Sequence, residues 1–264
     1  MNSLSIRPTA VAGMFYPSHP QKLSQLIKKF IDEAKIEIKQ KPKAIISPHA
    51  GYVYSGPIAG YSYKILLPYK REYKTIILLG PSHFEYIPGI AYHSSDYFET
   101  PLGIIPIDKS AIQKIQDFSF VFENDKAHRR EHSIEVQLPF LQYIFGNEIM
   151  IIPLAIGKVD PEDVVKVLQT LYTDQTLIVV SSDLSHYLDY STAKAIDEKT
   201  ALAIENQNPY DIHQEQACGR IGIQALLIFA KQKQWSTIRL DLRNSGDTAG
   251  DRKRVVGYGS WCFV

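Results

Sequence analysis

The sequence has few of the features that hold small or membrane-bound proteins together. Its 264 residues include only two cysteines, Cys218 and Cys262, which excludes a framework of several disulfides. No apolar run is long enough to cross a bilayer, and the N-terminus lacks the basic start and continuous apolar stretch of a signal peptide. Because lone thiols suit a reducing compartment, we expect a cytoplasmic protein with no membrane contact.

An excess of charge of one sign is also lacking. The 29 Lys and Arg residues nearly balance the 28 Asp and Glu residues, which leaves a formal net charge of +1. Such a chain has no long-range field to attract nucleic acid or an anionic membrane, so neither is expected as a partner. The densest basic segment, residues 252–254, has the size of an ordinary solvated turn.

Apolar runs alternate with helical segments along most of the chain. Four runs lack polar alternation, which is typical of strands covered on both faces, at residues 43–47, 74–80, 149–156 and 176–182. Helical spacing of apolar residues occurs at residues 21–34, 135–145, 161–172, 191–205 and 220–232. This alternation predicts an α/β fold with a mostly parallel central sheet between helical layers.

Two segments depart from this alternation. Residues 89–108, with turn residues at 100–103, predict a hairpin outside the main sheet. Residues 237–241 and 254–264 predict a C-terminal strand pair, which we expect to be antiparallel. Since the chain has no internal repeat and no linker rich in Gly, Pro or Ser, we expect a single domain over residues 1–264.

Histidines stand where three of the predicted strands end. His49, His83 and His186 each follow a strand within a few residues. In open α/β sheets the ligand crevice lies beyond the carboxyl ends of the strands, so these side chains are expected to share one cleft. One such histidine is usually structural, but three at equivalent places favour a functional site.

Few chemistries suit this set of side chains. Neutral imidazoles bind Zn, Fe, Cu or Ni. Two histidines and a carboxylate suit non-haem Fe(II) and oxygen, whereas the same ligands around zinc generate hydroxide for hydrolysis. Asp183, three residues before His186, could orient that imidazole or bind the metal, and without a metal the pair could act as a general base.

Three further segments contain polar residues or glycines in patterns that could mark a site. The segment 128–135 (HRREHSIE) carries more charge than the start of a helix needs, which makes His132 and Glu131 further pocket candidates. The glycines of residues 51–60 lack the spacing of a phosphate-binding loop and are interpreted as turn and helix-packing residues. Cys218, just before a predicted helix, is interpreted as a buried, unreactive thiol.

Six motifs, taken in order, resemble the Memo family. They are AGMFYP at residues 12–17, SPHAGY at 47–52, GPSH at 80–83, EHSIE at 131–135, SDLSH at 182–186 and CGR at 218–220. The resemblance covers essentially the full chain. The prokaryotic branch is also called AmmeMemoRadiSam system protein B, which implies a functional association with an AMMECR1-like protein and a radical SAM protein.

The family is similar in fold to the class III extradiol ring-cleavage dioxygenases (LigB-like), so the resemblance implies a three-layer α/β/α sandwich. It also implies that His49 and His83 bind a metal, expected to be iron, with copper or zinc as alternatives. Asp183 and His186 match the acidic and histidine positions beside them and are assigned catalytic roles together with His132.

The resemblance further implies that Tyr54 and Phe15 line the pocket as aromatic, substrate-binding walls. The third metal ligand is a Glu in the dioxygenases and a C-terminal Cys in animal Memo proteins. The corresponding stretch here, residues 243–251, contains no Cys, so Asp247 is expected as the third ligand, with Cys218 and His186 as alternatives. A carboxylate in place of a thiolate favours Fe or Mn over Cu(I).

Three functions follow as hypotheses. The leading one is a metal-dependent redox or dioxygenase-like enzyme that acts on an unidentified small molecule. The second is a non-catalytic scaffold that binds a peptide or protein in the same cleft, as animal Memo proteins are described as signalling adaptors and fold does not fix function. The third is a metal-dependent hydrolase.

Overall fold

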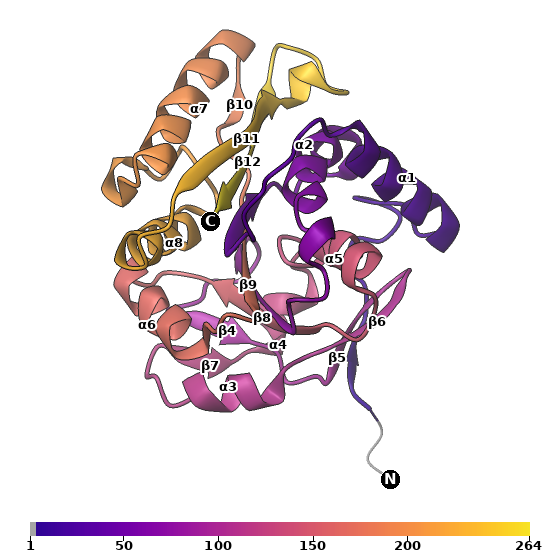
Figure 1. The fold of residues 1–264 in the computed structure, drawn as a ribbon, viewed down its shortest axis with the longest axis vertical. Helices are drawn as coiled ribbons and strands as arrows, with labels where there is room; N and C mark the ends of the chain where they lie inside the picture. The colour runs from indigo at the N-terminus through magenta and orange to yellow at the C-terminus, as the bar shows by residue number, and fades with distance from the viewer. Residues whose placement is uncertain (1–3) are drawn as a thin grey trace.

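A large mixed sheet lies between two layers of helices (Figure 1). The computed structural model describes residues 4–264. At the centre of the sheet, four parallel strands lie side by side: β2 (Ala44–Ser47), β9 (Thr176–Ser181), β3 (Thr75–Pro81) and β8 (Met150–Ile156). These are the four strands predicted from continuous apolar runs. Every residue of β2 and β9 is buried, because helices cover both faces.

Antiparallel strands extend the sheet on both sides. On one side, β12 (Val255–Phe263) pairs with β2, with β11 (Thr237–Asn244) and with the short β10 (His186–Leu188). On the other side, β4 (Ile90–Tyr92) is antiparallel to β8 and parallel to β7 (Val121–Glu123). The predicted antiparallel C-terminal pair is therefore confirmed, and parallel pairing joins the four central strands and the edge pair β4–β7.

The hairpin predicted over residues 89–108 is only partly outside the main sheet, because β4 belongs to that sheet and only the later strands form part of a second, smaller sheet. Its strands are β5 (Tyr97–Thr100) and β6 (Gly103–Pro106), joined by a tight turn, and β1 (Ile6–Arg7) runs parallel to β5. This pairing brings the N-terminal segment against the middle of the chain. Among residues 4–264, no helix is long and apolar enough to cross a membrane.

The helices form the two outer layers of the three-layer α/β/α sandwich. One layer contains α1 (Pro20–Glu33), α2 (Tyr52–Lys64) and α5 (Leu138–Phe145), which contact one another (Figure 1). The other contains α3 (Lys109–Ile115), α6 (Pro161–Leu171), α7 (Tyr190–Glu205) and α8 (Arg220–Gln232). A short helix, α4 (Asp125–Arg129), leads into the loop that carries His132.

Helix α2 packs unusually close to α1 through two glycines. A Cβ on Gly56 would lie 2.2 Å from the Phe30 ring, and one on Gly60 would lie 2.5 Å from the Phe30 carbonyl oxygen. The interpretation of these residues as helix-packing glycines is confirmed. The sequence did not indicate α2 itself, because its buried residues are mostly Tyr, Gly and Ser and form no one-sided apolar stripe.

We expect Gly60→Ala to destabilise the protein by about 1–3 kcal/mol, because the added methyl group meets main-chain atoms that cannot move without separating α1 from α2. Chemical denaturation measures the loss. Gly51→Ala is the matched control, since its Cβ would meet only ordinary van der Waals contacts at 3.7 Å or more. Equal stability of the two variants would contradict this account of the helix contact.

Candidate metal centre

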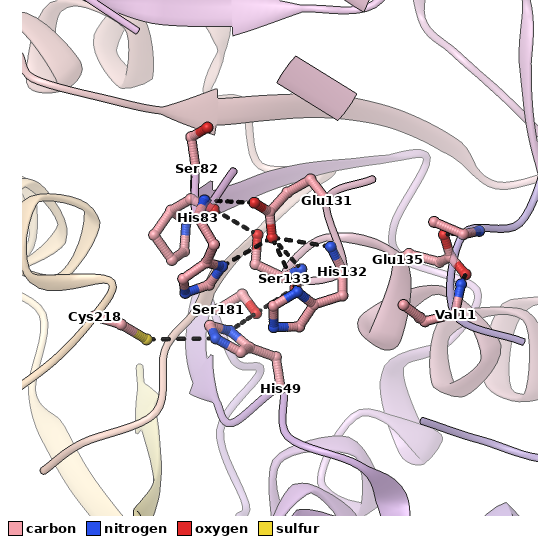
Figure 2. Close-up of polar contacts among 12 residues, drawn as sticks. Val11, His49, Ser82, His83, Glu131, His132, Ser133, Glu135, Ser181 and Cys218 are labelled. Carbon is pink, nitrogen blue, oxygen red and sulfur yellow. Dashed lines mark hydrogen bonds and ion pairs between the residues drawn. The ribbon is translucent and has the colours of Figure 1, made fainter. Parts of the chain in front are cut away.

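Three histidines from separate parts of the chain meet at the carboxyl edge of the central strands (Figure 2). His49 follows β2, His83 follows β3, and His132 lies in the loop between α4 and α5. One ring nitrogen from each lies within 4.8 Å of those of the other two. The His49 side chain is 2% exposed, that of His132 15% and that of His83 28%, so the group opens to solvent on the His83 side.

A hydroxyl group fixes which nitrogen of His49 carries its proton. The Ser181 Oγ donates its only hydrogen to the Ser133 carbonyl and accepts a hydrogen bond from Gln137 Nε2 at 2.7 Å. It can therefore only accept from His49 Nδ1, which lies 2.9 Å away. The lone pair of His49 is consequently on Nε2, the nitrogen available to a ligand.

Glu131 orients His83 in the same way. Its buried carboxylate accepts hydrogen bonds from the His83 ring Nδ1 at 2.9 Å and from the backbone N–H groups of His83, His132 and Ser133 at 2.6, 2.9 and 2.8 Å. Burial alone raises the pKa of Glu131, but these hydrogen bonds outweigh it and lower the pKa to about 2. The ionised carboxylate keeps the proton on Nδ1 of His83, which leaves Nε2 free to bind a metal.

Ring contacts hold His132 between the other groups. Its imidazole stacks on that of His83 with centroids 4.7 Å apart and planes 18° apart, and Phe15 packs on it at 4.7 Å. Its Nδ1 lies 3.4 Å from Glu131. Phe15 thus lies at the site, as expected of a wall residue. Tyr54 lies in the first turn of α2, where it is 40% exposed.

The electrostatics of the group suit a metal cation. Burial and the neighbouring imidazoles lower the pKa of His49 well below its usual value, and burial lowers the pKa of His132 to about 4. Both rings are therefore neutral at pH 7 and keep a lone pair. Neutral imidazoles whose other nitrogen is bonded to a protein acceptor are the usual ligands of Zn, Fe, Cu and Ni. The residues present fit a transition metal.

Asp183 lies beside His49, as its position after β9 suggested. Its Oδ1 accepts the His49 N–H at 2.8 Å, and its Oδ2 lies 4.0 Å from His49 Nε2. Burial raises the pKa of Asp183 to about 7, although hydrogen bonds from the backbone N–H groups of His49 and Ala50 oppose the shift. A carboxyl group with this pKa can both accept and release a proton near neutral pH.

Cys218, which was predicted as an alternative third ligand, also lies at the site. Its Sγ lies 3.3 Å from His49 Nε2 and accepts the Asp183 N–H at 3.3 Å (Figure 2). Burial and the Asp183 charge raise its pKa to about 12, so the thiol keeps its proton in the absence of a cation. Cys218 is buried, as expected, but it contacts the nitrogen that a metal would use.

Asp247 is not part of the histidine group. Its carboxylate accepts the Tyr190 hydroxyl at 2.7 Å and the Asn244 N–H at 3.1 Å, and so closes the short helical turn Ser245–Asp247 after β11. His132, a predicted catalytic residue, is the third member of the group instead. His186 lies in β10, outside the group of three, with a pKa lowered by burial and by the nearby His83.

A fourth histidine, His128, lies buried in α4, and its ionisation can be tested by the pH dependence of stability. Its Nε2 lies 2.9 Å from the Ala91 carbonyl, and burial lowers its pKa to about 3. The unfolded chain takes up this proton near pH 6.5 and the folded protein does not, so stability falls as the pH drops from about 6.5 towards 3, by about 1.4 kcal/mol per pH unit.

The side chain of His128→Gln cannot titrate. Between pH 6.5 and pH 5 we therefore expect the free energy of unfolding of this variant to fall by about 2 kcal/mol less than that of wild type. Urea denaturation of both proteins at the two pH values measures the difference. An identical pH dependence of the two proteins would show that folding does not lower the pKa of His128.

The fold and the site together define a class: three-layer α/β/α proteins with a group of histidines, suited to a metal, at the carboxyl edge of a parallel sheet centre. A family profile described as Memo-like protein matches residues 7–262. Three relatives are each described as a MEMO1 family protein. That of Aquifex aeolicus is 37% identical over 99% of this chain and 100% of its own length. Those of Nitrosopumilus maritimus and Thermotoga maritima are 36% and 35% identical, over 98% and 96% of this chain and 100% and 97% of their own lengths. The chain belongs to the Memo family.

Proposed function

We propose that this protein is a metal-dependent redox enzyme that holds one iron or copper ion through His49, His83 and His132 and acts on a small molecule. The observation that carries the proposal is the convergence of three ring nitrogens within 4.8 Å, with His49 and His83 each fixed by a hydrogen bond to the opposite nitrogen. An iron or copper ion bound there would supply one-electron chemistry and polarise a bound substrate.

The residues around the histidines would handle protons and water. Asp183, whose pKa burial raises to about 7, lies 4.0 Å from His49 Nε2 and would accept a proton, and His186 is the second candidate. Phe15 and the stacked His132 ring close one side of the centre and exclude water there. Cys218, next to His49 Nε2, is a fourth donor, and a thiolate favours the softer ions among those that imidazole accepts.

The redox proposal is tested by the identity and redox activity of the metal in the anaerobically purified chain. We expect about one iron or copper ion per chain, with an electron paramagnetic resonance signal that appears or disappears reversibly between oxidised and reduced samples. Stoichiometric zinc, which is silent in both samples, would overturn the redox proposal.

One observation favours hydrolysis as a second candidate. Three imidazoles with a nearby carboxyl group of pKa about 7 also suit a zinc ion whose bound water requires a general base, the role that Asp183 would take. In that case Asp183→Asn would abolish oxygen-independent turnover of ester or amide substrates, whereas a redox enzyme would show no such turnover in either form.

A further inference from the structure

A cavity of about 790 Å³ adjoins the histidine group. It lies between the loop after β3, the end of β8 and the start of α8. His83 and Cys218 line it, so it reaches the most solvent-accessible side of the candidate metal centre. Its volume is in the range of about 300–1,000 Å³ that is usual for small-molecule sites.

The charged side chains that line this cavity are mostly positive. They are Lys158 and Arg220, with Glu85 as the carboxylate. Within residues 4–264, neither cation forms an ion pair, and the Arg220 guanidinium makes one long hydrogen bond, at 3.4 Å, to Gln224. Most of its N–H donors are therefore available to a ligand in a geometry that matches a carboxylate or phosphate group.

Backbone N–H groups add to the positive charge on this wall of the cavity. At the start of α8, the N–H of Gly219 is bonded to Ser182 Oγ and that of Arg220 to the Ala217 carbonyl. The next two N–H groups, of Ile221 and Gly222, find no acceptor in the described part of the chain, and both residues line the cavity. The positive end of a 13-residue helix dipole thus lies on the same wall as Arg220.

We propose that this cavity binds the carboxylate or phosphate group of the substrate, with Arg220 as the main contact and Lys158 as the second. The anionic end lies at α8, and the rest of the molecule extends past His83 to the centre. That the bound anion is a substrate rests on the proposed function. The anion site itself rests on the cavity and its charges.

The experiment titrates the full, isotope-labelled chain with inorganic phosphate and, separately, with acetate, and follows the amide signals of Ile221 and Gly222 by NMR. We expect saturable shifts with the anion that the site prefers, and this preference separates phosphate from carboxylate substrates. Arg220→Gln should weaken binding about 10- to 100-fold, the loss expected for a charge-assisted contact, and Lys158→Gln less. Arg71→Gln, an exposed arginine away from the cavity, is the matched control.

His132→Ala separates this inference from the metal proposal, because His132 does not line the cavity. Anion binding that persists in this variant, whatever its metal content, supports an anion site that stands on Arg220. The inference is overturned if neither anion shifts the two amides in wild type, or if the double variant Arg220→Gln/Lys158→Gln binds like wild type. It is equally overturned if binding disappears with the metal in His132→Ala and is unaffected by Arg220→Gln.

Discussion

Replacement of Glu135 by Gln is expected to cost about 3–5 kcal/mol of stability, because it breaks a buried ion pair and leaves its partner without a counter-charge. The Glu135 carboxylate is fully buried and pairs with the Arg7 guanidinium. It also accepts the N–H groups of Ala10 and Val11, at 2.7 and 3.0 Å, and the Tyr16 hydroxyl, at 2.6 Å. One amide oxygen cannot satisfy all these donors.

We expect Glu135→Gln also to disturb the candidate metal centre. Arg7 donates to the His128 and Glu131 carbonyls, and the residues held by Glu135 flank Phe15, which packs on His132. Glu198→Gln is the matched control, since its ion pair with Arg239 is bidentate but half exposed and is expected to contribute under about 1 kcal/mol. Urea denaturation measures both variants. Similar small losses in the two would contradict the anchoring role of Glu135.

The second large effect is expected at Glu131, which orients the centre without belonging to the group of three. Glu131→Gln removes the charge that fixes the proton on His83 Nδ1 and replaces one acceptor oxygen with an NH₂ group facing backbone donors. We expect the affinity for a transition metal to fall about 10- to 100-fold with all three histidines in place. Competition with a chromophoric chelator measures the affinity.

Two controls separate orientation from misfolding. Circular dichroism should show the secondary structure of Glu131→Gln to be unchanged at room temperature. Glu123→Gln, an exposed carboxylate at the end of β7, should bind metal like wild type. Unchanged metal affinity in a folded Glu131→Gln variant would rule out the orienting role.

The sequence predicted the centre of the fold better than its margins. Long runs of Ile, Val and Leu identified β2, β3, β8 and β9, because a strand buried on both faces needs apolar residues at every position. Strands of two or three residues, such as β1 and β10, leave no periodic signal and form through tertiary pairing. Helix α2 was not predicted, because its close packing against α1 requires glycines rather than a stripe of leucines.

The residues of the candidate site also differ in whether a local sequence pattern indicates them. His49 and His83 were recognised because they follow predicted strands, whose ends meet at one edge of the sheet. His132 and Glu131 lie in a loop, where an excess of charge and the EHSIE motif were the only signals. The position of Cys218 against His49 depends on where the start of α8 packs, which no local pattern encodes. Asp247 was chosen by its place in the chain, but local hydrogen bonds hold it in a turn.

Elemental analysis tests whether His49, His83 and His132 hold a metal. The full chain is purified anaerobically without chelators or a histidine tag, as wild type, as His49→Ala/His83→Ala and as His213→Ala, a control that changes an exposed histidine away from the group. We predict about one transition-metal ion per chain in wild type and in His213→Ala, and loss of that ion in the double variant. Wild type without metal, or a double variant that retains the metal, would show that these histidines do not hold it.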